Sequence, residues 1–185
     1  MTMSPRLRKL VLTAHVTCSV GWLGAVAASL GLGVVGLASQ DAPTVRGAYL
    51  VLEPIGWLVL VPLSVASLLT GLVQSLGTTW GLFRHYWVLF KLLINVSASI
   101  VLLLYMQTLG YLADAAATTS SSGDPRALRD PSPVLHAGLA LLLLLVATAL
   151  AVYKPRGMTR YGQRKQQQRA LAKQHQQRAL SQPSP

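Results

Sequence analysis

Four ionisable side chains lie inside long apolar stretches of this sequence, where each is costly unless it finds a partner. They are His15, Glu53, Lys91 and His136. Ionisable residues within membrane segments are rare, and they mark proton, ion or ligand sites by default. A neutral imidazole is also the usual axial ligand of haem iron and a common ligand of other metals. These four residues are therefore the first candidates for chemistry.

The elements that must position them are four apolar runs, at about 10–38, 49–76, 86–112 and 134–153. Each is long enough to cross a hydrocarbon core, which takes roughly 20 residues. Only 11% of the 185 residues are charged, less than half the usual share in globular proteins. The first run exceeds the roughly 7–15 apolar residues of a secretory signal, so we interpret it as an uncleaved span. The sequence predicts an all-α, transmembrane four-helix bundle over residues 1–153, followed by a separate tail at 154–185.

The distribution of Lys and Arg predicts the orientation of the bundle. Of sixteen Lys and Arg residues, three precede residue 10 and eight follow residue 153. The two connections that must lie on the other side, 39–48 and 113–133, have no excess of positive charge. Because positive residues favour the cytoplasmic side, we expect a multi-pass protein of the cell membrane with both termini in the cytoplasm.

Once the orientation of each span is known, the depth of each ionisable residue in the membrane follows from its distance along the helix. His15 and Lys91 both lie about five residues from the cytoplasmic boundary, roughly 7 Å at the rise of a helix, so they share a level. Glu53 and His136 share the opposite level. His15 and His136 are separated by roughly 20 Å along the membrane normal, so one haem cannot bind both. His15 is then the candidate ligand of haem b or a metal, with Lys91 as a second ligand or a propionate partner.

Simpler interpretations stay open for the same residues. Lys91 has a stem long enough to place its ammonium group at the lipid phosphates. Glu53 and His136 are near enough to the opposite surface to be hydrated residues at helix ends, or to form a proton or metal contact there.

Small and polar residues form a stripe along three of the spans, and such stripes face the interior because lipid offers them no partner. The stripes consist of His15, Ser19, Trp22, Ser29 and Gly33; of Glu53, Trp57, Ser64, Ser67, Gly71, Gln74 and Thr78; and of Lys91, Asn95, Ala98 and Tyr105. Packing between helices is the alternative role for these side chains. On the opposite face of the first span, Gly24, Ala28 and Gly31 suit close contact with another helix, in a homo-oligomer or a membrane partner.

The segment HVTCSVGWLG, from His15 to Gly24, resembles the histidine-then-Trp-Gly opening of the copper-resistance protein D and HemJ-type four-helix membrane families. That resemblance implies a haem-associated protein whose motif residues are a histidine in the first span and a lysine in the third, here His15 and Lys91. The long basic tail departs from the HemJ type. The segment PLSVASLLTGLVQSLGTTWGLFRHYWVLFK resembles uncharacterised bacterial four-span integral membrane proteins, a likeness that implies no activity.

The tail is basic, rich in Gln and of low complexity. QQRAL occurs at 167–171 and again at 176–180, and at 100° per residue the two leucines point in opposite directions. An embedded amphipathic helix is therefore disfavoured, and a disordered or transiently helical segment that touches anionic lipid is expected. Binding to RNA or an acidic partner is the alternative, although Tyr161 is the only aromatic residue available to stack on bases.

Three functions remain compatible with these patterns: a haem- or metal-associated membrane protein, a small transporter or scaffold subunit that packs with partner helices without a cofactor, and a structural membrane protein without a ligand. The chain has no nucleophile elbow or phosphate-binding loop. Its single cysteine, Cys18, excludes an intrachain disulfide. Catalytic residues and enzyme activity are left open.

Overall fold

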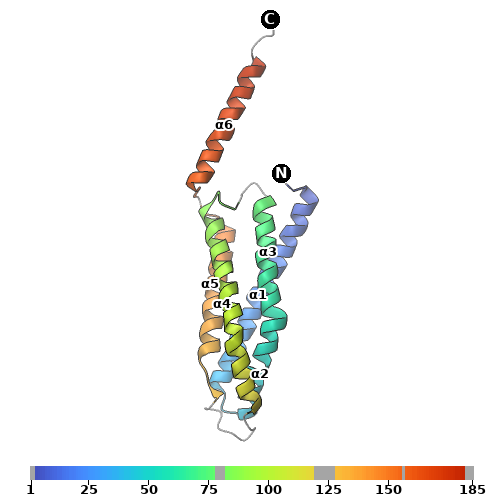
Figure 1. Cartoon of the computed structure of the whole chain (residues 1–185), viewed down its shortest axis with the longest axis vertical. Helices are drawn as coiled ribbons and strands as arrows, with labels where there is room; N and C mark the ends of the chain where they lie inside the picture. Colours follow the sequence, from blue (N-terminus) through green and yellow to red (C-terminus); the bar gives the residue numbers. More distant parts are fainter. Residues whose placement is uncertain (1–2, 78–81, 119–127, 156, 182–185) are drawn as a thin grey trace.

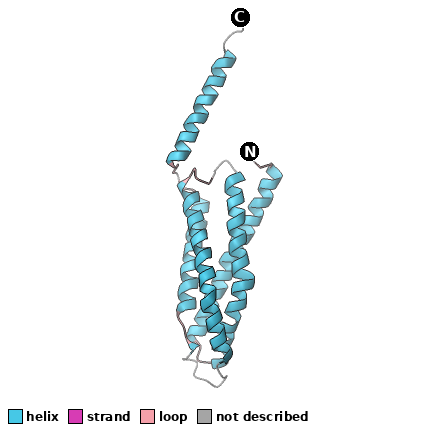
Figure 2. Cartoon of the chain, in the orientation of Figure 1, coloured by secondary structure: helices cyan, strands magenta, loops and turns pink. Residues whose placement is uncertain are grey.

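The computed structural model describes residues 3–77, 82–118, 128–155 and 157–181, and all the named elements in these ranges are helical (Figure 2). In chain order they are α1 (Pro5–Ala38), α2 (Ala42–Ile55), the π-helical turn η1 (Gly56–Leu60), α3 (Val61–Gly77), α4 (Tyr86–Thr118), α5 (Ser132–Tyr153) and α6 (Arg160–Ser181). The prediction of an all-α four-helix bundle is confirmed.

Four rods in the described residues are long and apolar enough to cross a membrane: Pro5–Ala38, Ala42–Gly77, Tyr86–Thr118 and Ser132–Tyr153. The second rod comprises α2, η1 and α3. The protein is therefore a multi-pass membrane protein with four spans. The rods contain most of the residues in the predicted spans, and the first three extend beyond them by one or two turns at one end.

The four rods form a ring in which each packs against two neighbours. α1 packs against α2, α3 and α5, and α4 packs against the same three helices, whereas α1 and α4 face each other across the bundle axis. The start of α1 and the end of α5 lie at one end of the bundle, called here the terminal end (Figure 1). The α1–α2 connection and the start of α5 lie at the other, called the loop end.

Hydrogen bonds to backbone groups hold the loop end together. Arg46 donates from Nε to Ala116 O at 2.8 Å, and Arg129 donates to Ser39 O at 2.7 Å. Both carbonyls lie at or next to a helix C-terminus, where a cation is favoured by the helix dipole. The Tyr49 hydroxyl accepts from Asp130 N at 3.0 Å. Charged and polar side chains at this end therefore satisfy main-chain groups.

The π-helical turn η1 corrects one sequence prediction. Pro54 lacks the N–H that a regular helix needs, and beyond it Val61 N bonds to Gly56 O, five residues back. The wider turn changes the phase of the helix by one residue. Trp57, predicted to share the interior stripe with Ser64, is instead 50% exposed, while Leu60 is buried. Trp57 therefore lies on the outer surface of the bundle.

The tail forms the helix α6, which contacts no other helix that the structure describes (Figure 1). Its sequence consists largely of Gln, Ala, Lys, Arg and Leu, which are good helix formers. The sequence favoured a disordered or transiently helical segment because no apolar face accumulates, and α6 indeed buries no such face. The high intrinsic helix propensity of these residues therefore explains why the tail is helical without packing against another helix.

Candidate functional site

His15 lies in the third turn of α1 and is buried, with 7% of its surface exposed. Its Nδ1 lies 3.1 Å from Ser67 O and 3.1 Å from Thr70 Oγ1 on α3. A carbonyl oxygen only accepts, so these contacts assign the ring proton to Nδ1 and leave Nε2 as an acceptor. The Thr70 hydroxyl donates to Ala66 O at 2.6 Å, which leaves its oxygen free to accept from His15. The position and tautomer of the imidazole are thus set by α3.

Lys91 meets the acceptor side of this imidazole. Its Nζ lies 3.1 Å from His15 Nε2, so the lysine donates and the histidine accepts. The two residues come from α4 and α1, which do not pack against each other directly. The contact therefore crosses the axis of the bundle, and the predicted shared level of His15 and Lys91 is confirmed.

Small residues around the pair make room for it. A Cβ atom added to Gly71 would lie 2.9 Å from His15 Cε1, so any larger residue there would push the ring away. Ser19 and Ser67 are hydrogen-bonded through their hydroxyls at 2.8 Å. Asn95, one turn beyond Lys91 on α4, is buried and donates to Lys91 O at 2.8 Å. These neighbours belong to the predicted stripes. The Ser19–Ser67 bond links α1 to α3, whereas the Asn95 bond lies within α4.

No carboxylate that the structure describes lies beside the pair. The Asp and Glu residues that the structure describes are Asp41, Glu53, Asp114 and Asp130, and all belong to the half of the bundle at the loop end. Two ammonium-like charges in contact repel strongly in a medium of low dielectric constant. We therefore exclude a doubly charged pair. Because Nε2 accepts from Lys91, we assign His15 as neutral, with its single ring proton on Nδ1.

The other polar candidates of the second rod have different surroundings. Ser64 is buried and donates to Val61 O at 2.9 Å within its own helix. Gln74 lies nearer the terminal end, and its Oε1 is buried without a hydrogen bond. Thr78 lies outside the described residues. Of this stripe, Ser67 and Gly71 contact His15 directly.

Glu53 and His136 do not form a joint site. Glu53 Oε1 lies near Gly110 of α4, where an added Cβ would be 3.5 Å away. His136 stacks on Tyr105 with ring centroids 4.0 Å apart, and its Nδ1 lies 2.9 Å from Ser132 O in α5. The two residues belong to the same half of the bundle, as predicted, but each contacts α4 separately.

The arrangement does not leave His15 open to a metal. Both ring nitrogens are engaged by protein groups, so iron would reach Nε2 only if Lys91 moved away. Among the described residues, no group of three or more His, Cys, Asp and Glu side chains could hold a metal ion. As they are placed, the residues fit a proton-sharing pair better than a haem ligand set.

Thr70 belongs to the site but was not predicted from the sequence. Thr70 follows Ser67 by one helical turn and precedes Gly71, so its position was a usable signal, but it falls at the margin of the predicted stripe. The comparisons with known proteins add no further residues, since no family model, curated protein or solved structure matches the chain.

Proposed function

We propose that this protein is a small membrane transporter, or a subunit of one, that binds and passes a proton at the His15–Lys91 pair. The observation that carries the proposal is the 3.1 Å contact between Lys91 Nζ and His15 Nε2. It joins two titratable side chains across the bundle interior, and no described carboxylate neutralises them. A structural role alone would be served at lower cost by two apolar residues of similar size.

When a proton binds to His15, the Lys91 side chain is displaced. A proton that binds His15 at Nε2 converts this nitrogen from an acceptor to a donor, and the hydrogen bond from Lys91 is lost. Two charges about 3 Å apart repel by roughly 5 kcal/mol at an effective dielectric constant of about 20. Lys91 must then leave or release its own proton. It lies in the second turn of α4, from which its stem can carry the ammonium group to the terminal end.

The terminal end is taken as the cytoplasmic one, in line with the bias of Lys and Arg along the sequence. Lys91 then exchanges protons with the cytoplasm, and His15 exchanges them with the bundle interior. The chemistry needs no cofactor, because the side chains themselves donate and accept the proton.

The test is proton movement into proteoliposomes that contain an internal pH dye, driven by a potassium diffusion potential. The native protein is expected to acidify the vesicles faster than protein-free vesicles do, and Lys91→Met and His15→Leu are expected to abolish the difference. Lys9→Met is the matched control, because it removes an exposed lysine at the same end of the bundle. Equal rates for the native protein and empty vesicles would contradict the proposal.

Haem or metal binding at His15 is the competing proposal, and it rests on the resemblance of HVTCSVGWLG to haem-associated membrane families. It requires Lys91 to leave Nε2, so the native protein would change conformation on loading. Oxidised and dithionite-reduced spectra of protein expressed with added haem separate the two. A Soret band that disappears in His15→Ala would favour haem, whereas a colourless protein would favour the proton pair.

A role as a subunit that packs with partner helices is favoured by one observation on α1. Gly24 and Gly31 are exposed, and a Cβ added to either would meet nothing within 4 Å. Ala28, between them, is also exposed. This surface would accept a close helix from a second copy or a partner. If it does, Gly24→Leu with Gly31→Leu would reduce the oligomer measured by crosslinking in membranes and leave the His15–Lys91 pair intact.

A further inference from the structure

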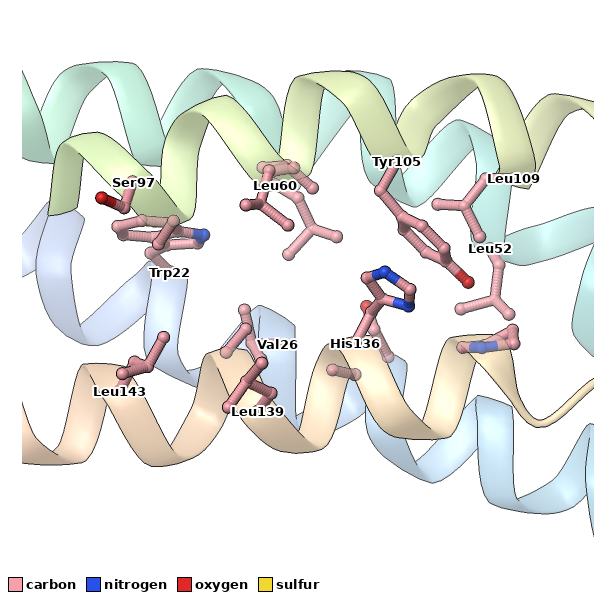
Figure 3. Close-up of a pocket in the computed structure, with 17 residues that line it drawn as sticks. Trp22, Val26, Leu52, Leu60, Ser97, Tyr105, Leu109, His136, Leu139 and Leu143 are labelled. Carbon is pink, nitrogen blue, oxygen red and sulfur yellow. The ribbon is translucent and has the colours of Figure 1, made fainter. Parts of the chain in front are cut away.

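A second interior feature lies away from the proton pair, between α1, α2, η1, α4 and α5. It is a cavity of about 140 Å³, lined mostly by apolar side chains (Figure 3). Val26, Leu52 and Leu60 form part of its inner wall, and all three are buried. Exposed side chains of α4 and α5, including Val101 and Leu139, form its rim. The cavity therefore opens sideways toward lipid, between α4 and α5.

One polar group in this apolar wall has no partner. The indole of Trp22 is only 2% exposed, and its Nε1 makes no hydrogen bond. Figure 3 shows this nitrogen turned toward the interior of the cavity. A buried donor left unsatisfied costs roughly 1–3 kcal/mol, so such groups in native proteins call for a reason. A ligand that supplies an acceptor would provide one.

The rest of the wall restricts the shape of that ligand. Tyr105 and His136 line the cavity as a stacked pair, and aromatic walls favour contact with a flat ring. The Tyr105 hydroxyl is buried and makes no hydrogen bond with the residues that the structure describes. For scale, an apolar cavity of about 150 Å³ accommodates benzene. The space therefore matches one six-membered ring.

The cavity also borders the irregular part of the second rod. Leu60, at the end of η1, lines it, and Leu52 lines it just before Pro54. π-helical turns within α-helices occur frequently at functional sites. The turn directs Leu60 inward and Trp57 outward, and in this way it shapes one wall of the cavity.

We propose that the cavity binds a lipid-soluble, single-ring molecule that bears a carbonyl oxygen, with Trp22 Nε1 donating a hydrogen bond to that oxygen. The ring lies between the side chains of α4 and α5, and the molecule enters from the bilayer through the opening between these helices. This proposal is independent of the proton pair, because none of the cavity's lining residues takes part in the hydrogen bonds described above for the side chains of His15 and Lys91.

The test uses two probes of nearly the same shape, acetophenone and α-methylstyrene, which differ in having an oxygen or a CH₂ group at one position. The protein is labelled with ¹⁵N at its tryptophan indoles and studied by NMR in lipid nanodiscs. The Trp22 signal is assigned by its loss in Trp22→Phe. Trp57, which is exposed on the outer surface, reports the shift caused by probe dissolved in lipid.

Acetophenone is expected to move the Trp22 indole proton downfield along a saturating curve, while the Trp57 signal shifts linearly or not at all. α-Methylstyrene is expected to bind about five- to tenfold more weakly, the usual effect of losing one neutral hydrogen bond. Ala140→Phe fills the cavity and keeps the indole, and it should abolish the saturating shift. Equal binding of both probes, or no saturation at Trp22 in the native protein, would overturn the proposal.

Discussion

The bundle interior contains two regions that differ in how their polar groups are satisfied. Around His15 every polar atom of the imidazole has a protein partner, on α3 and on α4. Two turns further along the same face of α1, the Trp22 indole has none. The first region is polar and closed, and the second is apolar and hollow. This difference is the basis of the two proposals, in which the first region handles a proton with its own side chains and the second binds an external molecule.

Removing His15 should have the largest effect on stability. His15→Leu takes away the acceptor of Lys91 and leaves its ammonium group against an apolar side chain, at a cost of about 3 kcal/mol. Lys91→Met leaves only a neutral acceptor unpaired, at about 1 kcal/mol. Unfolding by SDS in mixed micelles, followed by circular dichroism, measures both. The double variant should be more stable than His15→Leu alone, and a His15→Leu protein as stable as the native one would show that Lys91 is already in water.

Substitution at Gly71 tests the space that the imidazole needs. Gly71→Ala places a methyl group 2.9 Å from His15 Cε1, so we expect a loss of about 1–3 kcal/mol from overpacking together with slower proton movement. Gly31→Ala is the matched control, because nothing lies within 4 Å of its added Cβ. The same unfolding assay measures both variants. A loss of equal size at the two glycines would contradict the role given to Gly71.

Two tyrosines sharpen the contrast between satisfied and unsatisfied groups. Tyr49→Phe removes a hydroxyl that is hydrogen-bonded to the backbone of Asp130, so it should cost about 1–2 kcal/mol. Tyr105→Phe removes a buried hydroxyl without such a bond, so it should leave the free energy of unfolding unchanged or raise it by up to about 1–3 kcal/mol. If Tyr105→Phe proved the more damaging change, the Tyr105 hydroxyl would have a hydrogen-bond partner in the native protein.

The tail should have the smallest effect on the bundle. Deletion of residues 166–185 retains the contacts near the start of α6, including Thr159 N to Arg84 O at 3.0 Å. Since α6 packs against no other described helix, the free energy of unfolding should be unchanged. Binding to vesicles of anionic lipid should weaken, and more so at low salt. Unchanged binding to anionic vesicles would exclude the deleted segment as a lipid contact.

The four spans, and the shared depth that brings His15 and Lys91 into contact, could be predicted from the sequence. Both predictions depend on regular helical geometry, in which hydropathy sets the length and the rise per residue sets the depth. Asn95, Ser67 and Gly71 were found in the same way, because they follow the helical period along α3 and α4.

The outward position of Trp57 and the cavity could not be predicted, because neither follows from regular helical geometry. Trp57 was assigned to the wrong face because a π-helical turn changes the phase of a rod, and Pro54 alone does not specify such a turn. The cavity arises from side chains of four rods that fail to fill the space between them. No periodicity within one helix reports such a void, so Trp22 was recognised as interior but not as an unpaired donor.

The most direct test of the central claim is the ¹⁵N spectrum of the His15 imidazole in lipid bilayers at neutral pH, assigned by comparison with His15→Leu. The claim predicts a ring protonated at Nδ1 only, with Nε2 accepting a hydrogen bond from Lys91, and a change in the Nε2 signal in Lys91→Met. A doubly protonated ring, or an Nε2 signal that is the same with and without Lys91, would contradict the claim.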